Sequence, residues 1–174
     1  MEREKEVGRK LCIDISSVKS VSYGGSKFWL HIMDEASEHQ WAKFLKRKNE
    51  LSEVMITHVK HLRSLGYDVW VIRCDRAGEN EKFQKEAEEN GFGLTFEYTA
   101  PNTPQRNGRV ERKFATLYGR MRSMLNVARF PKDKREKLWA EAANTATKID
   151  NILVCERDGK SAYEKFWGKE PKYA

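Results

Sequence analysis

Cysteine, proline and long apolar runs are scarce in this sequence, and each shortage excludes a class of protein. The 174 residues include four prolines and three widely spaced cysteines, Cys12, Cys74 and Cys155. An odd number of cysteines without a CxxC pair argues against a disulfide framework and a structural zinc site. No run approaches the ~20 apolar residues that a membrane-spanning helix needs. The first ten residues, MEREKEVGRK, lack the apolar centre of a signal peptide. We therefore expect one soluble intracellular domain with a single core.

Acidic residues are rare in one part of a chain whose net charge is +7. The window from 104 to 135 contains ten basic residues and two acidic ones, and ten minus two is +8, so it holds the whole positive excess. Its bases are Arg106, Arg109, Arg112, Lys113, Arg120, Arg122, Arg129, Lys132, Lys134 and Arg135. Such a window indicates either a polyanionic partner or an ordinary solvated face, and charge alone leaves both open.

Hydrophobic periodicity predicts an α/β domain. We expect strands at 10–16, 27–34, 39–46, 67–75 and 94–98, and helices at 50–65, 80–90, 109–128 and 134–152. Short links join the first three strands, as in an antiparallel meander. Helices precede the fourth and fifth strands, so these strands can lie parallel to an earlier one. The order predicts a mixed five-stranded sheet, three antiparallel strands and then two parallel ones, covered by helices.

The pattern also predicts which side chains are buried. Apolar stripes place four tryptophans in the core: Trp29, Trp41, Trp70 and Trp139. The last helix is expected to turn Leu138, Ala142, Thr145 and Ile149 inward. The run APNTPQRNG, 100–108, reads as a loop, shaped by Pro104, Asn107 and Gly108.

Three acids lie where such a fold could bring them together. Asp14 interrupts the first strand, Asp75 follows an apolar strand, and Glu111 begins the long helix. Each also has an ordinary explanation. Asp14 could be paired with Lys10 or Arg76, Asp75 could cap a helix or form a turn, and Glu111 could be placed by the helix dipole alone. The three together are harder to explain in this way, because three separate coincidences would be needed.

Three neighbouring carboxylates repel one another, and cations must offset that repulsion. Hard divalent ions prefer oxygen ligands. Two such ions about 3.5–4 Å apart form a common arrangement for phosphoryl transfer. The acids would supply the ligands, with Asp14 bridging.

The motifs resemble a known family, the catalytic cores of retroviral-type integrases, and most closely those of copia-type (Pseudoviridae) LTR retrotransposons from Gag-Pol polyproteins. That family has two Asp and one Glu, with thirty-five residues between the second Asp and the Glu. Residues 76 to 110, thirty-five in all, separate Asp75 from Glu111. TPQRNGRVERKF is similar to the family's TPQQNGxxERKNRTL, and FWLHIMDEASEHQWAKFLKRKNE, LWAEAANTA and SAYEKFWGKEP are further matches. The likeness covers about residues 10 to 171. In one departure, DRAGENEKF stands where the family usually has Asp-Asn-Gly-Gly-Glu-Phe.

The resemblance implies an RNase H-like fold, two Mg²⁺ or Mn²⁺ ions, and DNA as the substrate. Asp14, Asp75 and Glu111 match the family's metal-binding and catalytic residues. The implied reactions are trimming of element 3′ ends and their joining to target DNA. The polar residues around Glu111 would bind DNA: Gln105, Arg106, Asn107, Arg109, Arg112 and Lys113.

The resemblance also sets expectations for organisation. Residues 1–9 would be an N-terminal extension, 10–153 the catalytic core, and 154–174 a C-terminal tail or linker. We expect a homo-oligomer without membrane contact, in a cytoplasmic particle before integration and in the nucleus during it. Two alternatives stay open: an RNase H-like nuclease, and a non-catalytic DNA-binding or assembly domain of a decayed or domesticated element.

Overall fold

A five-stranded mixed sheet forms the centre of the molecule. The computed structural model describes residues 4–99, 104–155 and 158–172. The strands are β1 (Lys10–Ser17), β2 (Phe28–Asp34), β3 (Gln40–Leu45), β4 (Val71–Cys74) and β5 (Thr95–Tyr98). They lie in the order β3-β2-β1-β4-β5. β1, β2 and β3 pair antiparallel, whereas β1–β4 and β4–β5 pair parallel. The predicted sheet and its strand directions are confirmed.

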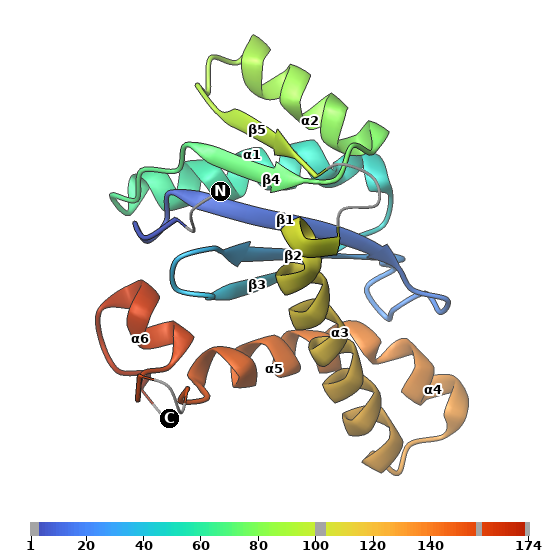
Figure 1. Ribbon diagram of the computed structural model, residues 1–174. Coiled ribbons are helices and arrows are strands. Elements are labelled where there is room, and N and C mark those ends of the chain that lie inside the picture. Colours follow the sequence, from blue (N-terminus) through green and yellow to red (C-terminus); the bar gives the residue numbers. More distant parts are fainter. Residues whose placement is uncertain (1–3, 100–103, 156–157, 173–174) are drawn as a thin grey trace.

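Helices cover both faces of this sheet (Figure 1). They are η1 (Lys48–Glu50), α1 (Leu51–Ser64), α2 (Gly78–Glu89), α3 (Pro104–Val127), α4 (Lys132–Lys137), α5 (Trp139–Ile152) and α6 (Ala162–Trp167). α3 crosses one face and α5 runs beside β3, while α1 lies on the other face (Figure 1). Among the described helices, none combines the length and apolar character needed to cross a bilayer.

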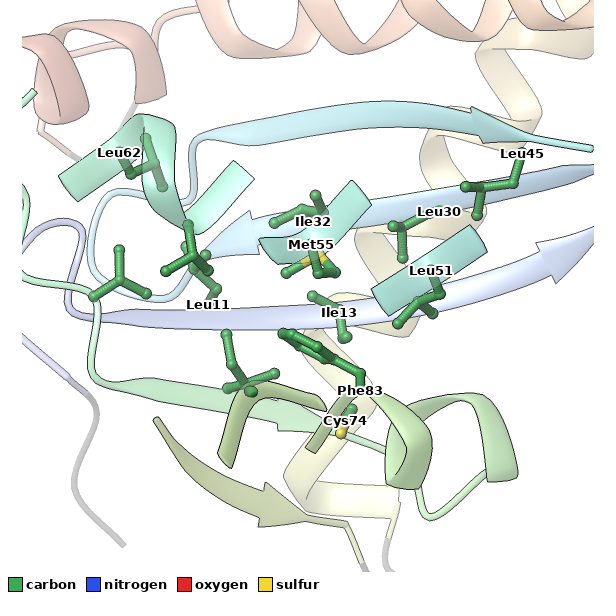
Figure 2. Close-up of a cluster of buried hydrophobic side chains, with 14 of the residues drawn as sticks. Leu11, Ile13, Leu30, Ile32, Leu45, Leu51, Met55, Leu62, Cys74 and Phe83 are labelled. Carbon is green, nitrogen blue, oxygen red and sulfur yellow. The ribbon is translucent and has the colours of Figure 1, made fainter. Parts of the chain in front are cut away.

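The alternation of β1 decides which side chains meet which helices. Leu11 and Ile13 point to the face covered by α1 and α2, where Met55 and Phe83 join them in one buried cluster (Figure 2). A second cluster lies on the opposite face, between the sheet, α3 and α5. Its buried members are Trp29, Phe114, Leu117, Met121, Trp139, Ala140, Ala143 and Ala146. Asp14, which alternates with Ile13, therefore faces the side of the sheet that α3 crosses.

The loop predicted over 100–108 is wrong from Pro104 onward, because α3 begins there. Residues 100–103 lie outside the described part of the chain. Proline suits the first turn of a helix, where its missing N–H has no intrahelical partner in any case. Asn107 and Gly108 are weak helix formers, but packing of the apolar stripe of α3 can outweigh local propensity. The Asn-Gly pair, which is typical of turns, therefore lies within a helix here.

Three further predictions are wrong in detail. Trp70 was expected in the core but is 46% exposed. The prediction failed because this segment is apolar on both faces, so the pattern does not indicate which face meets solvent. The helix expected over 134–152 is broken at Leu138 into α4 and α5. The buried residues of α5 are consequently Trp139, Ala140, Ala143, Ala146, Thr147 and Asn151, while Thr145 is exposed. The short α6 was not predicted, and its Phe166 is buried against the α1 side of the core.

The outer edge of the sheet, at β3, is closed at one point by a side chain of α5. Asn151 Oδ1 accepts a hydrogen bond from the backbone N–H of Gln40 (2.9 Å), and Asn151 Nδ2 donates to the Gln40 carbonyl (2.8 Å). Asn151 is buried. One amide side chain thus satisfies both backbone groups that Gln40 turns away from β2.

The helical start of α3 predicts how its glycines respond to substitution. A Cβ added at Gly108 or at Gly119 would meet nothing within 4 Å. Gly108→Ala and Gly119→Ala should each stabilise the chain by about 1 kcal/mol, or about 2–4 °C in melting temperature. Gly108→Pro should lower the melting temperature, because proline inside a helix costs up to about 3 kcal/mol. Thermal unfolding followed by circular dichroism measures all three, and an unchanged value for Gly108→Pro would restore the loop interpretation.

Candidate active site and nucleic-acid interface

Asp14 lies on β1 at a half-buried position where a free carboxylate is poorly solvated. Burial is the main cause that raises its pKa, from 3.8 to about 6. The negative charges of Asp75 and Glu111 raise the pKa further, whereas a hydrogen bond from the Ile15 backbone lowers it. The structure thus places both other acids within electrostatic reach of Asp14.

The ordinary explanation for Asp14 does not hold. It required an ion pair with Lys10 or Arg76, but both cations have other partners. Lys10 Nζ lies 2.6 Å from Glu97, and Arg76 Nε lies 3.1 Å from Glu81. Neither cation neutralises Asp14. The presence of this half-buried carboxylate, which is unfavourable for folding, therefore needs another explanation.

Asp75 follows the last residue of β4, and strand register sets it level with Asp14. The parallel pairs are Lys10 with Val71, Leu11 with Ile72 and Cys12 with Arg73. Every pair differs by 61, and 14 plus 61 is 75. Adjacent strands lie about 4.8 Å apart, so the two aspartates project from neighbouring positions at one end of the sheet.

The capping explanation for Asp75 is also wrong. The N-cap of α2 is Ala77, and no side chain caps this helix. Asp75 instead accepts a hydrogen bond through its Oδ1 from the side-chain amide of Asn80, at 2.6 Å. Asn80 belongs to the first turn of α2 and is 3% exposed.

Glu111 reaches the same region from α3. The preceding residue, Val110, is buried in a small cluster with Cys12 and Met33, which packs this part of α3 against β1 and β2. Glu111 itself is exposed. Because α3 begins at Pro104, Glu111 is the eighth residue of the helix. The helix dipole acts mainly on the first turn, so it does not explain this position.

The three acids approach one another without forming a ready-made ligand group. Among the side chains that the structure describes, no group of three or more His, Cys, Asp or Glu is arranged to hold a metal ion. Mutual repulsion favours such separation when nothing positive lies between the carboxylates. What the fold supplies is a common location for the three residues.

Beside Asp14 lies a buried polar network that sequence reasoning missed. His31, directly opposite Asp14 on β2, is fully buried and stacks on Phe114. Its Nε2 lies 2.8 Å from Gln40 Oε1, and Gln40 Nε2 donates to Asp150 at 2.5 Å. Burial lowers the pKa of His31 to about 4, so this ring is neutral at pH 7. The one sequence feature that could have indicated this network is a histidine within an apolar strand.

Of the six predicted DNA-binding residues, the structure describes the side chains of Arg112 and Lys113. The side chains of Gln105, Arg106, Asn107 and Arg109 lie outside the described residues. Arg112 is exposed and donates to the Gly108 carbonyl at 2.8 Å.

The charge of Lys113 is offset within the fold. Its ammonium lies 3.5 Å from Asp150 and 3.6 Å from Glu38. Arg120 also pairs with Asp150. Lys113 thus contacts α5 and the turn after β2, and Arg112 is the better exposed cation of the two.

Asp34 is the last residue of β2, and its side chain binds the turn that follows. Its carboxylate accepts hydrogen bonds from the Ser37 hydroxyl (2.6 Å), the Ser37 backbone (2.8 Å) and the Gly8 backbone (2.9 Å). Asp34 pairs with Leu11 on β1, so it points to the face opposite Asp14. Asp34 therefore stabilises the turn after β2 and lies away from the three acids.

Comparison with known proteins places the chain in a family. No protein-family model matches the chain. The chain is 34% identical over 155 residues to the retrovirus-related Pol polyprotein from transposon TNT 1-94 of Nicotiana tabacum, which covers 88% of the chain. It is 24% identical over 162 residues, 92% of the chain, to the corresponding polyprotein from transposon RE1 of Arabidopsis thaliana. The chain spans 11% of the length of each of these relatives.

Solved structures share the fold at low sequence identity. A chain of the simian T-cell lymphotropic virus intasome, in complex with PP2A regulatory subunit B56 gamma, matches with a TM-score of 0.72 at 16% identity, covering 100% of this chain and 61% of that one. The HTLV-2 integrase catalytic core domain, in complex with magnesium in a trimeric form, matches with a TM-score of 0.66 at 17% identity, covering 94% and 99%. The BIV integrase core gives a TM-score of 0.66 at 15% identity, covering 92% and 95%.

The shared fold is the RNase H-like fold expected from the sequence. The chain belongs to the family of retrovirus-related Pol polyproteins of plant retrotransposons, and it has the fold of integrase catalytic cores.

Proposed function

We propose that this domain is a metal-dependent polynucleotidyl transferase, which trims the 3′ ends of element DNA and joins them to target DNA. The observation that carries the proposal is the convergence of Asp14, Asp75 and Glu111 from a strand, a strand end and a helix. The pKa of Asp14 responds to both other charges. Kinship with retrotransposon Pol polyproteins supports DNA as the substrate.

The three side chains suit divalent cations, because carboxylate oxygens are hard ligands. Burial is the main cause of the raised pKa of Asp14, and the negative charges of Asp75 and Glu111, which a cation would offset, add to it. Asp14, Asp75 and Glu111 would hold two Mg²⁺ or Mn²⁺ ions, and a related fold has been solved with magnesium. When bound, such ions would activate the attacking oxygen and stabilise the leaving oxygen.

The chain's other residues would hold the nucleic acid. Arg112, with Arg106, Arg109 and Lys113, would bind backbone phosphates and set the position of the strand without reading its sequence. In trimming, water attacks a phosphodiester and the 3′-oxygen of the element leaves as a hydroxyl. In joining, that hydroxyl attacks a target phosphodiester, so one ester bond forms as another breaks. No covalent enzyme intermediate is involved, and no Ser or Cys nucleophile is required.

We also propose domain boundaries, an oligomeric state and a cellular location for this chain. Residues 10–153 would be the catalytic core, between an N-terminal extension (1–9) and a C-terminal tail or linker (154–174). We propose that the domain works as a homo-oligomer, supported by the trimeric form of the HTLV-2 core. It would act in the nucleus after transport in a cytoplasmic particle.

A disintegration assay tests the transferase activity. A branched DNA that mimics the joined product is incubated with the chain and Mn²⁺, and the resealed strand is measured on a denaturing gel. The unaltered chain should release product, Glu111→Gln should release none, and Glu53→Gln, an exposed acid on α1, should behave as the unaltered chain. Cutting without resealing would indicate a nuclease. DNA binding in EDTA without either reaction would indicate a binding or assembly domain.

The pKa of Asp14 predicts a pH-dependent stability cost. Because the fold raises this pKa from 3.8 to about 6, the unfolded chain ionises more readily, so stability falls as pH rises from about 4 to about 6. In EDTA at pH 7.5, Asp14→Asn should therefore stabilise the chain by about 1–3 kcal/mol, and the gain should vanish below pH 4. The exposed control Asp68→Asn should show no such gain. Thermal scans across pH measure this, and Asp14→Asn that destabilises at pH 7.5 would contradict it.

Arg112 and Lys113, the two described cations next to Glu111, should contribute unequally to DNA affinity. Arg112→Ala should weaken binding to duplex DNA several-fold and reduce the salt dependence by about one counterion, with an unchanged melting temperature. Lys113→Ala should weaken binding less, because Asp150 and Glu38 already offset its charge. Fluorescence anisotropy over a salt series gives both slopes, and a larger loss for Lys113→Ala would reverse this ranking.

A further inference from the structure

The segment that departs from the family motif, DRAGEN, is firmly folded at the start of α2. Lys48 Nζ lies 2.8 Å from Glu79. On the other side, Arg76 pairs with Glu81 and lies over the Tyr98 ring, 5.5 Å from its centroid. These contacts lie on both sides of Asn80 in the sequence.

Asn80 turns its side-chain amide toward Asp75. Its Nδ2 donates to Asp75 Oδ1 at 2.6 Å and lies 3.2 Å from the Asp75 backbone carbonyl. Both acceptors are oxygens, so the amide must present its nitrogen to them, and its own oxygen points away. A hydrogen bond to an ionised carboxylate is also stronger than one between neutral groups.

This orientation leaves Asn80 poorly suited to a purely structural role. Its Oδ1 is buried and has no hydrogen-bond partner within the described residues. A buried polar atom without a partner destabilises a fold, and an apolar side chain of similar shape would avoid that cost. The contact with Asp75 is what the amide adds and an isosteric leucine would lack.

Asp75 is a member of the acidic group whose orientation such a contact would restrict. It is exposed and stands just beyond the end of β4. An exposed side chain samples several rotamers, and the like charges of Asp14 and Glu111 favour rotamers that turn away from them.

We propose that Asn80 is a positioning residue that fixes the carboxylate of Asp75 by binding Oδ1, leaving Oδ2 for a divalent cation. This inference rests on the proposed function, because it gives Asn80 a role through a residue proposed to hold metal. Loss of a side chain that orients a metal ligand typically weakens metal affinity 10–100-fold.

Two leucine variants of buried asparagines separate positioning from folding. Asn80→Leu removes the hydrogen bonds to the carboxylate and the backbone carbonyl of Asp75, together with the unpaired oxygen. Asn151→Leu, the matched control on α5, removes two well-formed bonds to the Gln40 backbone and none to the three acids. Mn²⁺ affinity is measured by electron paramagnetic resonance of the free ion, and melting temperature is measured in EDTA.

We expect the two variants to show opposite behaviour. Asn80→Leu should weaken Mn²⁺ binding at least about tenfold, with a melting temperature within about 2 °C of the unaltered chain. Asn151→Leu should lower the melting temperature by several degrees and leave Mn²⁺ affinity unchanged in the folded protein. A metal-free measurement accompanies them: Asp75→Ala should shift the side-chain amide signals of Asn80 in ¹⁵N-resolved spectra in EDTA.

The outcomes distinguish this inference from the proposed function. If the unaltered chain shows no saturable Mn²⁺ binding that Asp75→Asn weakens, the proposed metal site fails and the role of Asn80 fails with it. If the chain binds Mn²⁺ and Asn80→Leu binds it equally well, only the positioning role is overturned. Two other results would also overturn it. One is that the amide signals of Asn80 do not shift in Asp75→Ala, and the other is that Asn80→Leu is as destabilised as Asn151→Leu.

Discussion

The parallel pairing of β1 with β4 is the constraint on which the candidate site depends. It sets Asp14 and Asp75 level across neighbouring strands, although sixty residues separate them in sequence. A slip of one residue would turn Asp14 to the opposite face or move it along the strand. Leu11 and Ile13 on one face, and Cys12 under Val110 on the other, oppose such a slip. The same packing that makes the core therefore fixes the spacing of the acids.

Strand positions and the face of Asp14 followed from alternation in the sequence, because each strand buries its apolar side chains on defined faces. The approach of the three acids followed only conditionally, once β1 and β4 were taken as neighbours. The start of α3 at Pro104 did not follow, since turn-forming residues there are overruled by packing. Nor did the roles of Asn80 and His31, whose hydrogen-bond partners depend on side-chain directions that no sequence period specifies.

Charges are arranged differently around Asp14 than around the buried base Lys10 of the same strand. Lys10 and Arg73 form ion pairs with Glu35 and Glu97. Around Asp14, like charges accumulate and the pKa of a carboxyl rises. Natural folds tolerate such local violations mainly at functional positions, where other parts of the structure supply the stability. The clusters packed on both faces of the sheet supply it here.

Asn151 has a consequence beyond the local stability of α5. By engaging both backbone groups of Gln40, it occupies the place where another strand would extend the sheet past β3. Open sheet edges are templates for uncontrolled growth, in which identical chains join strand to strand into aggregates. One amide on a helix blocks that growth at Gln40. Copies of this domain that meet along this side cannot begin by strand addition at that residue, so an ordered assembly there must form through side chains.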